Sequence, residues 1–199
     1  MSDIDNFFKL VQENDVRFID FRFTDSKGKW QHTSFSIGNV DKDTFTKGVM
    51  FDGSSIGGWR DINNSDMILR PEAGTACLDP FTPYPTIILT CDVIDPDTQE
   101  GYIKDPRHTA KLAEQYLQST KIGDVAYFGP ELEFFLFDDV RFKSGMFGCS
   151  YEVDSEELPK NTDKVYEMGN MGHRPRIKGG YFPVPPVDSG FDIRQEMME

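Results

Sequence analysis

The sequence has little of the residues and patterns that mark several common protein classes. Its three cysteines, Cys77, Cys91 and Cys149, are far apart and form no CxxC pair, which excludes a disulfide framework and a zinc knuckle. No apolar run is long enough to cross a membrane, and the first residues are acidic where a secretory signal is basic. We therefore expect a protein of the reducing cytoplasm that has no membrane partner.

Positive charge is also scarce. Only 21 Lys and Arg residues stand against 34 Asp and Glu, which gives a net charge of -13. Such a chain is not expected to hold nucleic acid through a general positive field, whereas a site for cations is plausible. Neither GxxxxGKS/T nor GxGxxG occurs, so any nucleotide would be bound without a P-loop or a Rossmann turn.

Apolar periodicity predicts an α+β fold for the 199 residues. Residues 4–11 carry apolar side chains at helical spacing, with Ser2 or Asp3 placed to cap the first turn. Alternation over 16–24 and 30–37, around a polar turn with glycine, predicts a β-hairpin. Further strands are expected in a set of three short segments, residues 67–70, 76–78 and 86–95.

A second domain is expected to begin near residue 103. Residues 95–101 have the composition of a linker, and Asp105 with Pro106 then supplies a cap and a first-turn residue for a helix. We therefore predict two domains, 1–103 and 104–199.

The second domain is expected to be incomplete. A strand is predicted over residues 125–137 and a turn over 143–145. Asp188 or Ser189 can cap a last helix that begins near Gly190, but this helix shows no stop signal before the chain ends. Because so short a helix needs a tertiary partner, we expect the chain to be a fragment.

The strongest chemical signal is the run Gly129-Pro130-Glu131-Leu132-Glu133-Phe134-Phe135. In a strand, Glu131 and Glu133 share one face, about 6.6 Å apart along the backbone. Hard divalent cations prefer carboxylate oxygen. Five of the seven residues 131–137 are apolar, which predicts a largely buried strand in which unpaired carboxylates are costly. This context favours a metal-binding pair over an ordinary half-exposed strand.

Two other segments have unusual backbone requirements. Asp52 precedes Gly53-Ser54-Ser55, a loop whose backbone can approach a ligand closely. Tyr181 lies between a glycine pair and a proline-rich stretch, Lys178-Gly179-Gly180-Tyr181-Phe182-Pro183. Taken alone, each segment is typical of an ordinary structural loop. The histidines His32, His108 and His173 have no spacing that indicates a ligand pair.

Together these motifs resemble the glutamine synthetase family. Phe51-Asp52-Gly53-Ser54-Ser55, the Gly129–Phe135 run and the Lys178–Pro183 run have the family's order and spacing, and the resemblance covers nearly the whole chain. Residues 63–67 and 172–175 are similar to the proteobacterial type I form. Leu132 and Met171 stand where close relatives often carry proline and lysine, and neither departure removes a proposed ligand.

The resemblance implies a small N-terminal β-grasp domain followed by the first part of a glutamine synthetase-type catalytic α+β domain. It implies that Glu131 and Glu133 each bind a different one of two Mg2+ or Mn2+ ions. Asp52, Ser55 and Tyr181 match catalytic positions that line an ammonium pocket, where the aspartate would take a proton from ammonium.

The implied reaction is the ATP-dependent ligation of ammonia to glutamate through γ-glutamyl phosphate. Metal ions would stabilise the charge that develops during phosphoryl transfer, and ammonium must lose a proton before it can attack. Family members assemble as rings, including dodecamers, in which one subunit's first domain completes its neighbour's site. The fragment alone is therefore expected to be inactive.

Two other classes of function fit parts of the sequence. A retaining glycosidase needs two carboxylates roughly 5 to 5.5 Å apart, which Glu131 and Glu133 can approach, although no aromatic sugar platform supports this reading. A noncatalytic interaction module is the other alternative, because a β-grasp fold is a common binding scaffold and fold does not fix function.

Overall fold

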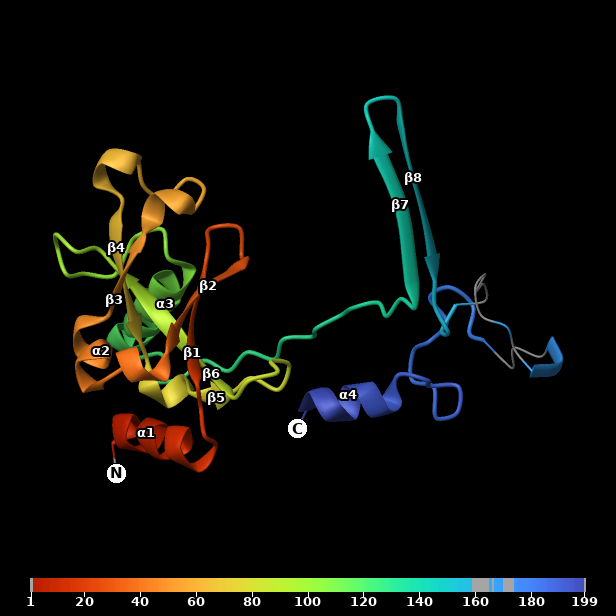
Figure 1. The fold of residues 1–199 in the computed structure, drawn as a ribbon, viewed down its shortest axis with the longest axis horizontal. Coiled ribbons are helices and arrows are strands. Elements are labelled where there is room, and N and C mark those ends of the chain that lie inside the picture. Colours follow the sequence, from red (N-terminus) through yellow and green to blue (C-terminus); the bar gives the residue numbers. More distant parts are fainter. Residues whose placement is uncertain (1, 159–164, 166, 170–173, 199) are drawn as a thin grey trace. The chain divides into compact units, whose positions relative to one another are not determined.

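The structure, a computed structural model, describes residues 2–158, 165, 167–169 and 174–198 (Figure 1). The chain forms two compact units, residues 1–128 and 129–199, and each has its own internal packing. The first contains a six-stranded sheet with three α-helices, and the described part of the second contains a two-stranded sheet and a short α-helix. The α+β class predicted from the sequence is confirmed. The domain boundary near residue 103 stays a prediction.

The first helix forms where apolar spacing and capping both predict it. Helix α1 spans Asp3–Glu13, and the Ser2 hydroxyl accepts a hydrogen bond from the Asp5 backbone N–H at 3.2 Å. The Asp5 carboxylate accepts in turn from the Ser2 backbone, which completes a capping box. The side chain of Phe7 on its inner face is almost completely buried.

Six strands make the main sheet, in the spatial order β2-β1-β6-β4-β3 with β5 beside β6. All neighbouring pairs are antiparallel except β1 and β6, which run parallel. The predicted hairpin and the three further predicted strands are confirmed, whereas the edge strand β3 was not predicted. The strands are β1 (Phe18–Thr24), β2 (Trp30–Ser36), β3 (Val49–Asp52), β4 (Asp66–Pro71), β5 (Cys77–Leu78) and β6 (Thr86–Ile94).

Short helices fill the connections of the first unit. Helix α2 (Lys42–Lys47) precedes β3, and its last turn ends at Gly48, whose φ of +76° belongs to the region that glycine tolerates best. The connections of this unit also contain 3-10 turns, namely η1 (Ile37–Asn39), η2 (Gly53–Ser55), η3 (Ile62–Asn64) and η4 (Ala73–Thr75).

The core of the first unit is rich in aromatic side chains. Alternation along β1 sends Ile19, Phe21 and Phe23 into it, while Asp20 and Arg22 take the opposite face. Burying an aliphatic or phenyl side chain of this size contributes about 1.5–3 kcal/mol. The Phe23 ring lies 5.6 Å from that of Trp59, so the core extends to the loop that follows β3.

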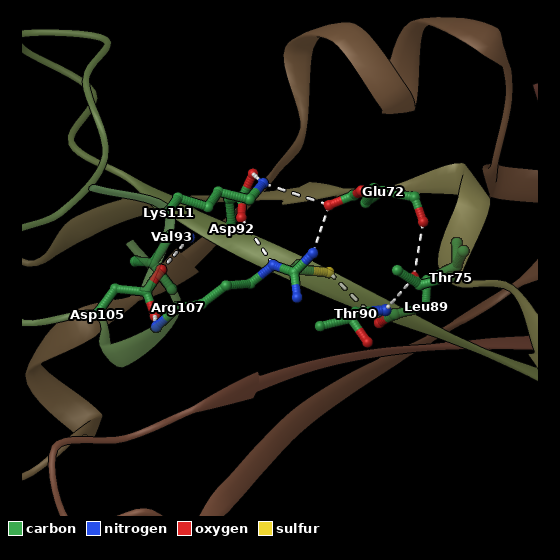
Figure 2. A network of polar contacts seen from close by, with 10 residues as sticks. Glu72, Thr75, Leu89, Thr90, Asp92, Val93, Asp105, Arg107 and Lys111 are labelled. Carbon is green, nitrogen blue, oxygen red and sulfur yellow. Dashed lines mark hydrogen bonds and ion pairs between the residues drawn. The ribbon is translucent and has the colours of Figure 1, made fainter. Parts of the chain in front are cut away.

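Helix α3 (Pro106–Thr120) lies on the sheet through polar contacts (Figure 2). None of its side chains is buried. Arg107 and Lys111 reach Asp92 on β6, with N···O distances of 2.9 and 2.6 Å, and both also pair with Glu72. The predicted cap is confirmed, since the Asp105 carboxylate accepts from the Arg107 backbone N–H at 3.0 Å.

Two predictions for the segment that follows α3 are wrong. Residues 125–137 form no strand, and the expected buried environment of this segment is absent: Tyr127, Phe128 and Phe135 are exposed. A strand needs a neighbour for its backbone groups, and within the described residues none pairs with this segment. The predicted turn over 143–145 lies instead at residues 146 and 147.

That turn joins β7 (Asp139–Gly145) to β8 (Gly148–Asp154) in an antiparallel hairpin, a long ribbon in Figure 1. The predicted last helix is confirmed as α4 (Phe191–Met198). Among the described residues between the hairpin and α4, Glu167–Gly169 form the 3-10 turn η5.

Candidate functional site

Asp52, the first predicted catalytic residue, ends β3 and caps the 3-10 turn η2. Its carboxylate accepts hydrogen bonds from the Ser54 backbone N–H at 2.9 Å and from the Ser54 hydroxyl at 2.6 Å. These bonds, with smaller contributions from Ser55 and Ser65, lower the pKa of the Asp52 carboxyl below its ordinary value of 3.8. Because Asp52 is also exposed, it offers an anion to solvent at neutral pH.

The backbone of the same loop depends on Gly53. Its N–H donates to the Ser65 carbonyl at 2.7 Å, and a Cβ at this position would lie 2.5 Å from Cγ of Met67. A side chain therefore cannot be added here without displacing the buried side chain of Met67. In the same strand pair, Asp66 lies opposite Asp52. Two exposed carboxylates thus share the end of the β3–β4 pair with Ser55, which is exposed as well.

Glu131 and Glu133, the predicted metal ligands, lie on the irregular segment before β7. Both are exposed. Their carboxylates are hard oxygen donors, which fit Mg2+ or Mn2+ in kind, but such ions take about six ligands. Within the residues that the structure describes, no group of three or more His, Cys, Asp and Glu side chains could hold a metal. The pair therefore supplies two donors of the right chemistry and needs others to complete a site.

Tyr181 is exposed, and its ring packs edge-on against Phe182 with a centroid distance of 4.5 Å. The backbone turns sharply on both sides of it, since Lys178 and Phe182 have φ values of +60° and +57°. Of the nearby motif residues named from the sequence, Met171, Gly172 and His173 lie outside the described residues.

The five predicted site residues belong to different units. Asp52 and Ser55 are in the first, where the 3-10 turn η2 begins directly after Asp52 and ends at Ser55. Glu131, Glu133 and Tyr181 are in the second. The functional roles of all five remain predictions.

One charged cluster was missed by sequence reasoning. Nδ1 of His32, a residue set aside in the sequence, lies 2.6 Å from Oδ1 of the buried Asp20, which also accepts from the Ser34 hydroxyl at 2.7 Å. Arg22 bridges Asp20 and Asp79 at 2.7 and 2.8 Å. The available signal was the alternation of β1, which places Asp20 and Arg22 on one face.

Comparison with protein families assigns both parts of the chain. The model described as "Glutamine synthetase, beta-Grasp domain" matches residues 15–96, and "Glutamine synthetase, catalytic domain" matches residues 103–199. The predicted fold, a β-grasp domain followed by the start of a catalytic domain, is thereby confirmed. None of the helices in the described part combines the length and apolar character that crossing a bilayer requires.

Individual relatives give the same family. The chain is 54% identical over 198 residues to a glutamine synthetase of Rhizobium meliloti (strain 1021), covering 100% of the chain and 42% of that protein. It is 56% identical over 189 residues to a "3-hydroxylaminophenol mutase" of Cupriavidus pinatubonensis (strain JMP 134 / LMG 1197), covering 95% of the chain and 40% of that protein. The chain thus spans about two fifths of the length of these curated relatives.

A solved structure supports the fold. The cryo-EM structure of a Plasmodium falciparum glutamine synthetase matches with a TM-score of 0.79 at 20% sequence identity, over 99% of this chain and 39% of that one. At this identity the likeness shows the fold alone.

Proposed function

This chain belongs to the glutamine synthetase family, and on that premise we propose that it forms the N-terminal part of a cytoplasmic enzyme that ligates ammonia to glutamate at the expense of ATP. The observation that carries the proposal is the match of two glutamine synthetase domains, in order, along one chain. Asp52, Ser55, Glu131, Glu133 and Tyr181 would contribute to its active sites.

Asp52 would attract ammonium and take its proton. Its hydrogen bonds from Ser54 keep the carboxylate ionised at neutral pH, and the opposite carboxylate of Asp66 adds to the negative field. A carboxyl with a lowered pKa is a weak base, so deprotonation of ammonium would be unfavourable by itself and would be drawn forward as the ammonia formed is consumed by attack on the activated substrate. Ser55 and Tyr181 would orient the ammonium through their hydroxyl groups.

Glu131 and Glu133 would each hold one of two Mg2+ or Mn2+ ions. The bound ions would supply charge neutralisation during transfer of the γ-phosphoryl group of ATP to glutamate, which gives γ-glutamyl phosphate. Only one residue separates the two glutamates, and as anions they repel each other unless cations neutralise them. Further oxygen donors would have to come from the substrates, water and other parts of the enzyme.

Residues 1–199 alone would be inactive. Two glutamate ligands do not complete a divalent-cation site, and the described residues offer no larger donor cluster. The active enzyme would self-associate into rings, with dodecamers as the expected form. The β7–β8 hairpin supports self-association, because its apolar side chains Phe142, Phe147 and Tyr151 are exposed at 78%, 99% and 82%.

The test is an activity assay of the purified full-length protein with glutamate, ammonium, ATP and Mg2+ or Mn2+. We expect metal-dependent formation of glutamine, and no glutamine from residues 1–199 alone. A parallel incubation with 3-hydroxylaminophenol is needed, because a relative of equal identity is named a mutase. Conversion of that compound without any glutamine synthesis would contradict the proposed function.

A further inference from the structure

The loop that carries Asp52 is held by the segment that precedes α3. We call residues 52–59 the Asp52 loop. The Tyr102 hydroxyl donates to the Trp59 carbonyl at 2.6 Å, and the Lys104 ammonium group donates to the carbonyls of Gly58 and Trp59. The end of the loop is therefore fixed by two side chains that are more than 40 residues away in sequence.

The turn between β1 and β2 closes these contacts into a ring. The Trp59 indole N–H donates to the Ser26 hydroxyl at 2.9 Å. The Ser26 hydroxyl in turn donates to the Lys104 carbonyl at 3.4 Å. Trp59 and Tyr102 are only 4% and 6% exposed, and their rings pack edge-on at 5.3 Å. The hydrogen bonds of these two buried side chains hold them rigidly in one arrangement.

The holding segment is itself fixed to the sheet. The Tyr102 backbone N–H donates to the Val93 carbonyl at 2.8 Å, and the Asp105 carboxylate accepts from the Val93 N–H at 3.2 Å. Figure 2 shows Asp105 beside Val93, with Arg107 of α3 reaching Asp92 on the same strand. Tyr102 and Lys104 therefore lie at the end of a strand that carries much of the core.

Short backbone hydrogen bonds connect the held end of the loop to its functional end. The Trp59 N–H donates to the Ile56 carbonyl at 3.1 Å, and the Ile56 N–H donates to the Gly53 carbonyl at 3.2 Å. Gly53 follows Asp52 directly. A displacement of Trp59 is thus passed along two successive turns to Asp52 and Ser55.

We propose that Tyr102 and Lys104 are positioning residues for the ammonium site, acting through Trp59 and Gly58 on Asp52 and Ser55. The inference rests on the function proposed above for Asp52 and Ser55. Burial raises the pKa of the Tyr102 hydroxyl, which keeps it protonated as a donor at neutral pH.

The experiment compares single variants of the full-length protein. Tyr102→Phe and Lys104→Met should raise the KM for ammonium at least about fivefold, the factor that one hydrogen bond contributes, with the KM values for glutamate and ATP unchanged. Lys104→Arg should restore the wild-type value, because arginine keeps a cationic donor. Tyr84→Phe, a half-exposed tyrosine elsewhere in the unit, is the matched control and should change nothing.

Amide hydrogen exchange supplies a readout that does not require turnover. In Tyr102→Phe and Lys104→Met, exchange of the Ile56 and Trp59 amides should be faster, while exchange in β6 stays as in the wild type. An unchanged ammonium KM, or an equal rise in all three KM values together with a lower unfolding temperature, would overturn the positioning role. A wild-type protein that forms no glutamine would instead overturn the proposed function, and the positioning role with it.

Discussion

Asp52 and Asp66 lie opposite each other at the end of the β3–β4 pair, and both carboxylates are exposed. Like charges in such positions repel, and the repulsion is relieved when a cation binds between or beside them. The facing carboxylates of Asp52 and Asp66 are therefore suited to binding ammonium.

Replacing each aspartate separately should distinguish their roles. In the full-length protein, Asp52→Asn should lower kcat/KM for ammonium by about 100-fold, the lower range for loss of a general base. Asp66→Asn should raise only the KM for ammonium, by a smaller factor that shrinks as ionic strength increases. Initial rates at varied ammonium and salt measure both effects. Equal losses in the two variants would show that Asp52 acts through charge alone.

The charged cluster around Asp20, described above, should make the free energy of unfolding sensitive to acid. Burial raises the pKa of the Asp20 carboxyl, but hydrogen bonds from Ser34, Arg22 and His32 outweigh it and hold the pKa below 3.8. A lowered pKa in the folded state gives stability that is present above the unfolded value and is lost as pH falls through the folded value. Asp20→Asn should therefore cost about 3 kcal/mol at pH 7, and less in acid.

Urea unfolding of the wild type and Asp20→Asn at pH 7 and at pH 3 measures this difference. The control is Asp43→Asn, which removes the exposed Asp43–Lys47 pair and should leave stability unchanged. A cost of Asp20→Asn that grows toward acid pH would contradict the assignment.

Asp105 should behave in the opposite way. Burial raises the pKa of the Asp105 carboxyl above 3.8. The hydrogen bonds that the carboxylate accepts from the backbone N–H groups of Val93 and Arg107 lower the pKa, but by less. The folded state therefore binds this proton more tightly than the unfolded state, so the contribution of Asp105 is greatest below pH 3.8 and falls as pH rises through the folded pKa. Asp105→Ala should cost about 2 kcal/mol through loss of the cap and an unpaired Val93 N–H.

Asp105→Asn keeps an acceptor oxygen without the charge and should cost less than Asp105→Ala. In urea unfolding, the stability of Asp105→Asn minus that of the wild type should increase as pH rises from 3 to 7. A wild type whose stability rises relative to that of Asp105→Asn between pH 3 and pH 7 would contradict the direction of the pKa change.

Much of the first unit could be predicted from sequence because its signals are local. Ser2 and Asp105 cap helices in a way that a few residues reveal, and strands such as β1 alternate cleanly. Strand β3 was missed because it runs directly into the turn Gly53-Ser54-Ser55, and the whole segment was interpreted as a loop. The β7–β8 hairpin was missed because its turn residues, Met146 and Phe147, lack the glycine or asparagine that usually marks a tight turn.

The segment 125–137 shows the limit of composition. Its aromatic residues are typical of a buried strand, but burial depends on neighbours that lie elsewhere in a chain. The same holds for the site. The motif around Asp52 is visible in the sequence, whereas the contacts of Trp59 with Ser26 and Tyr102 join residues 33 and 43 positions apart and leave no local pattern.

The most direct test is Mn2+ binding to the full-length protein, measured by titration calorimetry for the wild type, Glu131→Gln and Glu133→Gln. Glu114→Gln, on the exposed side of α3, is the control. The wild type and the control should each bind two ions per chain, and each site variant should lose one of them, or bind it at least tenfold more weakly. Two ions bound with wild-type affinity in both site variants would contradict the proposed metal site.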